Sequence, residues 1–225
     1  MKIKLITTLA ALAIGIMATH ALALPYNTQT EFSVNGINVP TTGIDATTGL
    51  GTRTFTFNTA GNYDVRAFID LDLSLFITGF SNEYGETFNL PKSGQSWEID
   101  EPGYFVGDLY SNFIGSGFDN TIGTNGYTTI QQPDDVAVGM GWDFNLQAGY
   151  NATLSFTVSD TAPISSLFYI GQFESFGLND PVYFISDLLI NPIGTPSEVP
   201  EPSTFALVGS ALAGLGFYAR RRRNR

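Results

Sequence analysis

The fold class is decided by one stretch, VRAFIDLDLSLFI at residues 65–77. Every odd position in it carries an apolar side chain, whereas Arg66, Asp70 and Asp72 occupy even positions. A period of two is typical of a β-strand with one buried face and one solvated face. Because the stretch is long for a single strand, we expect it to bend midway.

The same alternation recurs over Val136–Leu146 and Ala152–Val158, with Trp142 on the apolar face. Ala148 and Gly149 separate the two stretches, so we expect a β-hairpin here. Weaker patterns predict further strands at Glu31–Val39, Thr52–Phe57, Thr87–Leu90, Tyr104–Tyr110, Leu167–Ile170 and Val182–Ile190. About eight strands without a helical stripe predict an all-β, two-sheet sandwich or jelly roll.

The composition excludes several classes of function. The chain of 225 residues holds 21 acidic and 10 basic residues, one histidine and no cysteine. Disulfides, thiolate nucleophiles and cysteine-bound zinc are therefore excluded. The basic residues gather at the two ends of the chain, and only Arg53, Arg66 and Lys92 lie between them. We expect no nucleic-acid binding, since that requires clustered basic residues.

The first 23 residues have the pattern of a signal peptide. Lys2 and Lys4 precede an uncharged apolar run, and Ala21 and Ala23 occupy the two positions that a signal peptidase reads. A first core helix is the alternative, but the run has too few polar positions for an amphipathic helix. Cleavage after Ala23 would also remove His20, the chain's one histidine.

The last residues combine a proline-rich motif, an apolar run and a basic tail. The motif at 199–204 consists of Val199, Pro200, Glu201, Pro202, Ser203 and Thr204. An apolar helix over 205–219 would rise about 23 Å, which makes it a marginal span of a bilayer core of roughly 30 Å. The tail at 220–225 includes Arg220, Arg221, Arg222 and Arg223, so we expect it to stay cytoplasmic while the preceding chain is exported.

Together these residues resemble the PEP-CTERM protein-sorting signal of exopolysaccharide-producing Gram-negative bacteria. The resemblance implies recognition by an exosortase, a membrane cysteine protease or transpeptidase that cuts near the Pro-Glu-Pro motif. It implies that Pro200, Glu201 and Pro202 are recognised, and that the four arginines hold the substrate in the inner membrane until it is processed. The alternative is an ordinary tail anchor that remains in the membrane.

These patterns divide the chain into three parts. We expect a signal peptide at 1–23, a β-sandwich passenger domain at 24–196 and a sorting signal at 197–225, which includes a short transmembrane helix. Pro192, Gly194, Pro196 and Ser197 disfavour regular structure, so they mark a linker between the last two parts.

Acidic residues are the candidates for chemistry in the passenger domain. A glycosidase needs two carboxyls, and these are candidates: Glu98, Asp100, Glu101, Asp134, Asp135 and Glu174. Oxygen ligands in loops also suit calcium, for which Asp119, Asp134, Asp135 and the group Glu98, Asp100 and Glu101 are candidates. None of them matches a calcium-loop motif. We therefore expect no catalytic residue and no cofactor, with calcium as the cation to test.

Aromatic residues could bind a sugar if their rings were exposed. Trp97, Tyr104, Tyr110 and Tyr127 lie near acids, amides and glycines, but we expect most of these rings to pack in the core. The prediction is thus a non-enzymatic protein of the cell surface or of an exopolysaccharide matrix, as in a biofilm. Its expected partners are the exosortase, the inner membrane during sorting, and exopolysaccharide. Alternatives are a carbohydrate-binding or calcium-binding extracellular module, or a carboxylate-dependent polysaccharide hydrolase.

Overall fold

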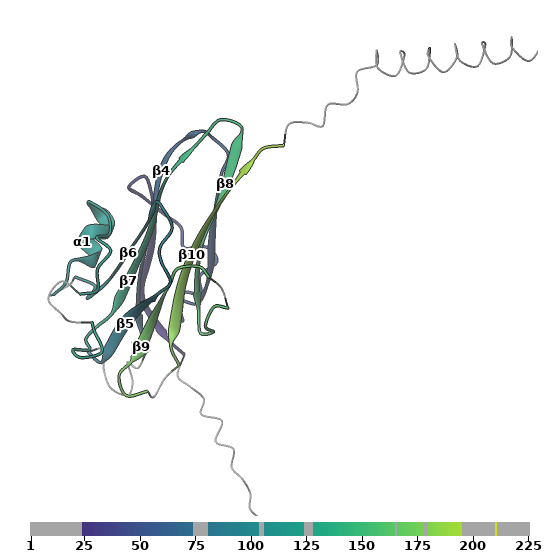
Figure 1. Cartoon of the computed structure of the whole chain (residues 1–225). Coiled ribbons are helices and arrows are strands. Elements are labelled where there is room, and N and C mark those ends of the chain that lie inside the picture. Colours follow the sequence, from purple (N-terminus) through teal and green to yellow (C-terminus); the bar gives the residue numbers. More distant parts are fainter. Residues whose placement is uncertain are drawn as a thin grey trace, which may run out of the picture.

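Two five-stranded antiparallel sheets pack face to face in the computed structural model (Figure 1). The structure describes residues 24–73, 81–103, 106–123, 128–164, 166–177 and 180–194, together with Ser210. The predicted all-β, two-sheet sandwich is confirmed.

The strands of each sheet are not consecutive along the chain. The first sheet has the order β2 (Ile37–Val39), β1 (Tyr26–Val34), β4 (Gly61–Asp72), β7 (Ala137–Leu146) and β6 (Gln95–Asp100). The second sheet has the order β3 (Gly51–Phe57), β8 (Tyr150–Ser159), β10 (Val182–Pro192), β9 (Tyr169–Glu174) and β5 (Glu83–Phe88). One short helix, α1 (Leu109–Ile114), lies against the first sheet on the side away from the second sheet (Figure 1).

The core between the sheets is built from the apolar positions that alternate along the strands. From Val65 onward the odd residues of β4 are at most 2% exposed, namely Val65, Ala67, Ile69 and Leu71. They belong to one cluster with inward residues of β7, β8 and β10. Trp142 faces this core as predicted, and its Nε1 donates a hydrogen bond to Ser186 Oγ over 2.9 Å.

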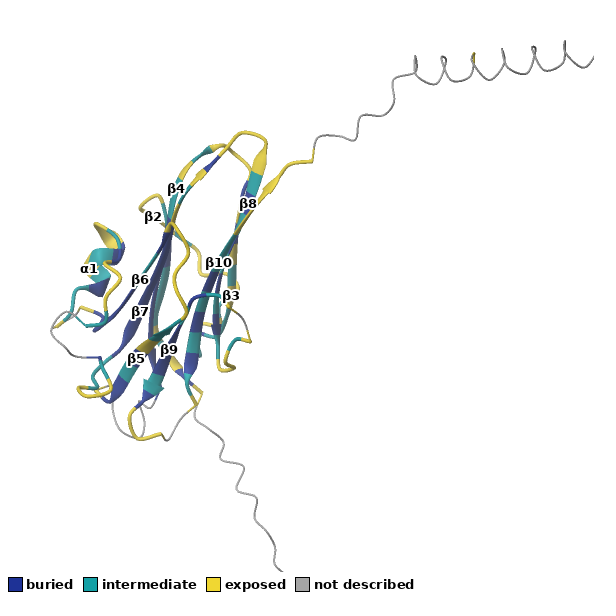
Figure 2. Ribbon diagram, viewed as in Figure 1, coloured by how far each residue is buried: buried dark blue, intermediate teal, exposed yellow. Residues whose placement is uncertain are grey.

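The even face of β4 is not solvated as the alternation predicted. Asp70 is 2% exposed and Asp72 is 6% exposed. A second layer lies on this face, because α1 is placed beside the first sheet (Figure 2). Leu109 and Phe113 of α1 pack against Phe68 there. Alternation of apolar and polar residues reports only the main core, because polar residues on the other face can be covered by a separate element.

The predicted hairpin over 136–158 is wrong, although both of its strands exist. β7 pairs with β4 and β6 in the first sheet, whereas β8 pairs with β3 and β10 in the second. The turn at Gly149, which has a φ of 86°, carries the chain from one sheet to the other. β7 is buried on both faces from Ala137 to Trp142, as a central strand beneath a second layer must be.

Two other strand predictions also need correction. The stretch Glu31–Val39 is not one strand, because Asn35 and Gly36 adopt positive φ values of 51° and 75° and turn β1 back into β2. The strand predicted at Tyr104–Tyr110 is wrong at its end, because Leu109 begins α1. Strand β6 was not predicted, whereas the remaining weak predictions overlap β3, β5, β9 and β10.

Several sequence predictions lie outside the described residues. They concern residues 74–77 of the first stretch, the signal peptide at 1–23, the sorting motif at 199–204, the basic tail at 220–225 and, apart from Ser210, the apolar helix at 205–219. Within the described part of the chain, no helix has the length and apolar character needed to cross a membrane.

Candidate metal site

Acidic residues gather on the outer face of the first sheet, beside α1. The strand register places Ala137 of β7 between Asp70 of β4 and Asp100 of β6. One row further along, Gly139 lies between Phe68 and Glu98. Residues that are opposite each other, or two apart on one strand, share a face of the sheet. The carboxylates of Asp70, Asp100 and Glu98 therefore project from the same face.

Three further carboxylates adjoin this face. Asp72 follows Asp70 on β4, and Thr28 Oγ1 donates a hydrogen bond of 2.7 Å to its Oδ2. Asp108 directly precedes α1, and Asp135 lies two residues before β7. The charges of Asp72 and Asp135 both act on Asp70. We call the six residues the acidic cluster: Asp70, Asp72, Glu98, Asp100, Asp108 and Asp135.

Three members of the acidic cluster approach one another closely. One carboxylate oxygen from each of Glu98, Asp100 and Asp108 lies within 4.8 Å of the other two. Asn112 of α1 donates to both oxygens of Glu98 over 3.0 and 3.1 Å. The backbone N–H groups of Glu101 and Asp108 donate to Asp100 over 2.9 and 3.4 Å. These donors are neutral, so they orient the carboxylates without balancing their charge.

Three buried oxygens of the acidic cluster have no hydrogen-bond partner within the part of the chain that the structure describes. They are Asp70 Oδ2, Asp108 Oδ1 and Asp135 Oδ1. Asp70 is the most deeply placed of these residues, with 2% of its surface exposed. Because a buried carboxylate oxygen without a partner is costly, three in one cluster need an explanation.

The pKa values of the cluster reflect burial and mutual repulsion. Burial, together with the charges of Asp135 and Asp72, raises the pKa of Asp70 to about 8. Burial also raises the pKa of Glu98 to about 8, against the opposing effect of the Asn112 hydrogen bond. For Asp135, burial and then the charge of Asp72 raise the pKa to about 7. A nearby cation would favour the ionised form of each group.

Among the described residues, basic side chains do not supply a positive charge that pairs with the acidic cluster. Residues 24–194 contain three of them, Arg53, Arg66 and Lys92. The Arg53 guanidinium lies 4.5 Å from the centre of the Phe55 ring, on the second sheet. Arg66 Nε donates to Asp64 over 2.8 Å, and Lys92 pairs with Asp187 over 2.6 Å. Arg66 Nη1 also donates to the carbonyl oxygens of Asn112, Phe113 and Gly115, beside the acidic cluster. In the described part of the chain, however, no basic side chain forms an ion pair with a carboxylate of the cluster.

The structure brings together only some of the residues that the sequence singled out for calcium. Glu98, Asp100 and Asp135 belong to the acidic cluster, and burial and the charge of Asp134 raise the pKa of nearby Glu101 to about 7.

The two other calcium candidates lie beside residues of this region. The N–H of Asp119 donates to Glu98 over 3.4 Å and the charge of Asp119 acts on Glu98 and Asp108, whereas the charge of Asp134 acts on Glu101. The Oδ1 of Asp119 accepts two hydrogen bonds from Thr121, and the Oδ1 of Asp134 accepts one from the N–H of Asp135. Sequence reasoning missed Asp70, Asp72 and Asp108. The signal for the first two was their spacing on one face of a strand, which we interpreted as a solvated face.

The other functional candidates are dispersed. Glu174, a candidate for a glycosidase pair, accepts hydrogen bonds from Asn82 Nδ2 over 2.8 Å and from the N–H of Phe176 over 3.1 Å. Among the aromatic candidates, Trp97 packs against Phe168, with 5.7 Å between ring centres. Tyr110 packs edge-on against Phe68, and its hydroxyl donates to Glu31 over 3.2 Å. Tyr104 and Tyr127 lie outside the described residues.

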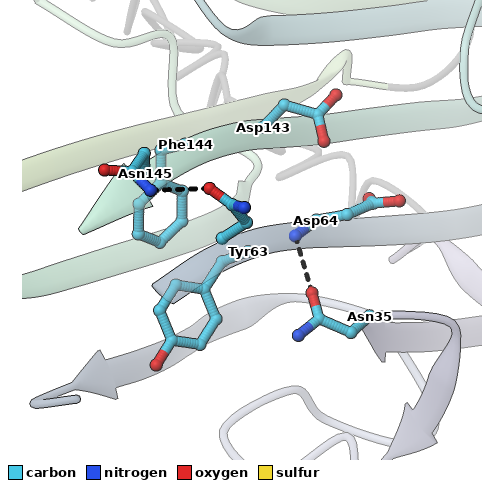
Figure 3. A pocket seen from close by; sticks show the side chains of 7 residues that line it. Asn35, Tyr63, Asp64, Asp143, Phe144 and Asn145 are labelled. Atoms are coloured by element: carbon cyan, nitrogen blue, oxygen red, sulfur yellow. Dashed lines mark hydrogen bonds between the residues drawn. The ribbon is translucent and has the colours of Figure 1, made fainter. Parts of the chain in front are cut away.

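A groove of about 400 Å³ opens at the other end of β4 and β7 (Figure 3). It is lined by Asn35, Asn62, Tyr63, Asp64, Asp143, Phe144 and Asn145. Asn145 Nδ2 donates to Asn62 Oδ1 over 2.6 Å, and Asn35 Oδ1 accepts from the N–H of Asp64 over 2.8 Å. The rings of Tyr63 and Phe144 stack on each other with 5.3 Å between centres. The groove therefore offers amides and carboxylates beside two aromatic rings.

Comparison with known families identifies one segment of the chain. Residues 198–223 match the PEP-CTERM protein-sorting motif. The match confirms the resemblance inferred from the C-terminal residues, and it marks an exported protein that is sorted at a membrane and processed by an exosortase. Neither the curated proteins nor the solved structures contain a match to the chain.

Proposed function

We propose that the chain is a non-enzymatic protein whose β-sandwich is delivered by an exosortase to the cell surface or to an exopolysaccharide matrix, where it acts as a structural or adhesive module. One observation carries this proposal, the match of residues 198–223 to the PEP-CTERM motif. The matched segment begins shortly after β10 ends at Pro192, so the folded domain and the sorting signal follow each other directly.

The position of β10 supports processing after folding. β10 lies at the centre of the second sheet and pairs with β8 from Tyr183 to Pro192. A cut near Pro200–Pro202 falls beyond this pairing and leaves every strand intact. If the new C-terminus is attached to another molecule, a pulling force enters a strand that is hydrogen-bonded along its length, which suits a protein held in a matrix.

The residue inventory supports a non-enzymatic role. The chain has no cysteine, and its one histidine, His20, lies in the predicted signal peptide. Nucleophiles activated by an imidazole, and thiolate nucleophiles, would thus be missing from the exported passenger.

Carbohydrate binding is a second candidate, and the groove favours it. Amides and carboxylates hydrogen-bond sugar hydroxyls, and aromatic faces pack against the apolar side of a sugar ring. We expect exopolysaccharide of the host to bind the full chain, with the affinity reduced by Asn62→Ala and unchanged by Thr54→Ala, an exposed residue of β3. Equal binding by all three proteins would contradict a role for the groove.

Mass and location of the protein in an exosortase-containing host test the main proposal. We would compare the wild type with the double variant Pro200→Ala, Pro202→Ala, and use Pro196→Ala as the matched control upstream of the motif. The wild type and the control should lack residues 1–23 and 205–225 and fractionate outside the inner membrane. The double variant should keep its arginine tail and accumulate in the inner membrane.

Two outcomes would count against the proposal. If the wild type keeps residues 205–225 in inner-membrane fractions, the segment is a permanent anchor. If the double variant is processed like the wild type, Pro200 and Pro202 are not the recognition element.

A further inference from the structure

We propose that the acidic cluster is a calcium-binding site, in which Glu98, Asp100 and Asp108 supply the closest set of oxygens and Asp70 a buried neighbouring one. This inference does not depend on the sorting of the protein, since it rests on the outer face of the first sheet. It assigns a ligand to carboxylates that the proposed structural role leaves unexplained.

The first argument is the approach of three carboxylates. The oxygens of Glu98, Asp100 and Asp108 lie within 4.8 Å of one another, a spacing at which one ion could contact all three. Like charges this close repel strongly where water is partly excluded. Hydrogen bonds from Asn112 and from backbone N–H groups hold the carboxylates in place despite that repulsion.

The second argument is independent of the first and comes from Asp70. Its side chain is almost completely buried, and its Oδ2 has no hydrogen-bond partner among the described residues. The register places Asp70 and Asp100 on the same face, on either side of Ala137, and the charges of Asp135 and Asp72 act on Asp70. A buried carboxylate oxygen that faces other carboxylates and lacks a donor is the arrangement expected of a metal ligand.

The third argument is charge. Arg53, Arg66 and Lys92 are the basic residues of 24–194, and none of them forms an ion pair with a cluster carboxylate among the described residues. Burial and mutual repulsion raise the pKa of several cluster carboxyls, so ionisation is unfavourable without a cation. A bound divalent ion would compensate the charge and supply a partner for the orphaned oxygens.

The ligand chemistry selects calcium. The site offers oxygen donors from carboxylates, and the chain has no cysteine and no histidine after residue 20. Zinc prefers nitrogen and sulfur ligands in a tetrahedral site, and magnesium requires a small octahedral shell. Calcium accepts six to eight oxygens with flexible geometry. Weak extracellular calcium sites work at the millimolar concentrations that an exported protein meets.

Binding would add an ionic link between elements that apolar packing and the Asn112–Glu98 hydrogen bonds already join. Asp100 ends β6, Asp108 begins the segment that leads into α1, and Asp70 belongs to β4. One ion between them would fix α1 and its flanking loop to the outer face of the first sheet. The expected role is therefore stabilisation of the exported sandwich.

Thermal unfolding of the full chain in mild detergent tests the proposal, first with EDTA and then with calcium chloride. Calcium should raise the Tm of the wild type by several degrees. Asp108→Asn and Asp70→Asn should each weaken calcium binding at least tenfold. Asp187→Asn removes one negative charge from the second sheet, next to Lys92, and should leave the calcium response unchanged.

The sign of the effect in EDTA separates a metal ligand from a purely structural aspartate. As a ligand, Asp70 costs stability when no ion is bound, so Asp70→Asn should be more stable than the wild type in EDTA and should lose its response to calcium. A structural aspartate would instead make the variant less stable under both conditions. That result would overturn the role of Asp70.

Terbium gives a second measurement that does not need the variants to fold. Tb³⁺ should bind the wild type, show luminescence sensitised by nearby aromatic residues, and be displaced by calcium. No calcium-dependent rise in Tm and no displaceable terbium signal would overturn the proposal. An equal rise with magnesium would contradict the assignment to calcium.

Discussion

At the scale of single residues, polar groups inside the core form hydrogen bonds with specific partners. Ser186 Oγ accepts hydrogen bonds from Trp142 Nε1 and Gln95 Nε2, each over 2.9 Å. These three residues come from β10, β7 and β6, so one hydroxyl joins the second sheet to the first. The sequence predicted that Trp142 faces the core, but it carried no sign of Ser186 or Gln95 as its partners, because such contacts depend on how the two sheets are placed.

Replacing this hydroxyl should destabilise the fold. Ser186→Ala leaves Trp142 Nε1 without its acceptor and leaves Gln95 Nε2 only the long hydrogen bond of 3.5 Å to the Ser186 carbonyl. An unsatisfied buried donor costs about 1–3 kcal/mol. We expect the free energy of unfolding to fall by about 2–3 kcal/mol, measured by urea unfolding followed by tryptophan fluorescence. The half-buried Ser155 on the neighbouring strand provides the control, and Ser155→Ala should change stability by less than about 0.5 kcal/mol. Equal losses for both variants would show that the shared hydroxyl is not important.

At the scale of elements, the sequence predicted well where strands lie but poorly which strands pair with each other. Alternation placed the apolar residues of β4 and β7 in the core correctly, because it reflects a local geometry. It could not show that β7 and β8 belong to different sheets, since a hairpin and a crossing between sheets need the same turn residues. It also missed α1, which buries Leu109 and Phe113 in too few residues for a helical period to show.

Contact between α1 and the sheet depends on the small residues of β7. A Cβ atom on Gly139 would lie 2.3 Å from Phe118 Cε1, so the ring would have to move. Phe118 belongs to the apolar cluster that holds α1, so we expect Gly139→Ala to lower the free energy of unfolding by about 1–3 kcal/mol. Hydrogen exchange should accelerate over residues 109–120 before it does so elsewhere. Gly194→Ala has open space around it and should leave both measurements unchanged.

At the scale of the whole molecule, the two ends of the sandwich differ in character. The acidic cluster lies at the end of β4 and the start of β7, whereas the groove and the end of β10 lie near Leu146 and Tyr150. A ten-residue strand such as β7 spans roughly 30 Å. The acidic cluster is therefore far from the end of β10, and we expect calcium binding and exosortase processing not to interfere with each other. The sequence located the sorting signal because that signal is local, but the acidic cluster only exists once strands distant in sequence come together.

Glu83 joins the two sheets, and it should make stability depend on pH. It lies in β5 of the second sheet, is fully buried, and accepts a hydrogen bond of 2.6 Å from the N–H of Leu73, just after β4. Its other oxygen accepts a hydrogen bond from Gln172 Nε2. Burial raises the pKa of Glu83 well above its usual value, because the two hydrogen-bond donors offset the loss of hydration only in part. The nearby negative charges of Asp72 and Asp135 raise this pKa as well.

The sign of the pH effect follows from this raised pKa. At a pH between the pKa of Glu83 in the unfolded chain and its higher pKa in the folded chain, the native state holds a proton that the unfolded state has released. The contribution of Glu83 to stability is therefore fully present below the unfolded pKa and is lost as the pH rises through the folded pKa. With EDTA present throughout, the stability of the wild type should fall from pH 5 to pH 8. One proton contributes a slope of about 1.4 kcal/mol per pH unit. Glu83→Gln should reduce the slope by that amount, as measured by urea unfolding at each pH. The control Glu86→Gln, which replaces an exposed residue of the same strand, should leave the slope unchanged. A stability that increases from pH 5 to pH 8 in the wild type would contradict the prediction, because it would mean that Glu83 is ionised in the folded chain.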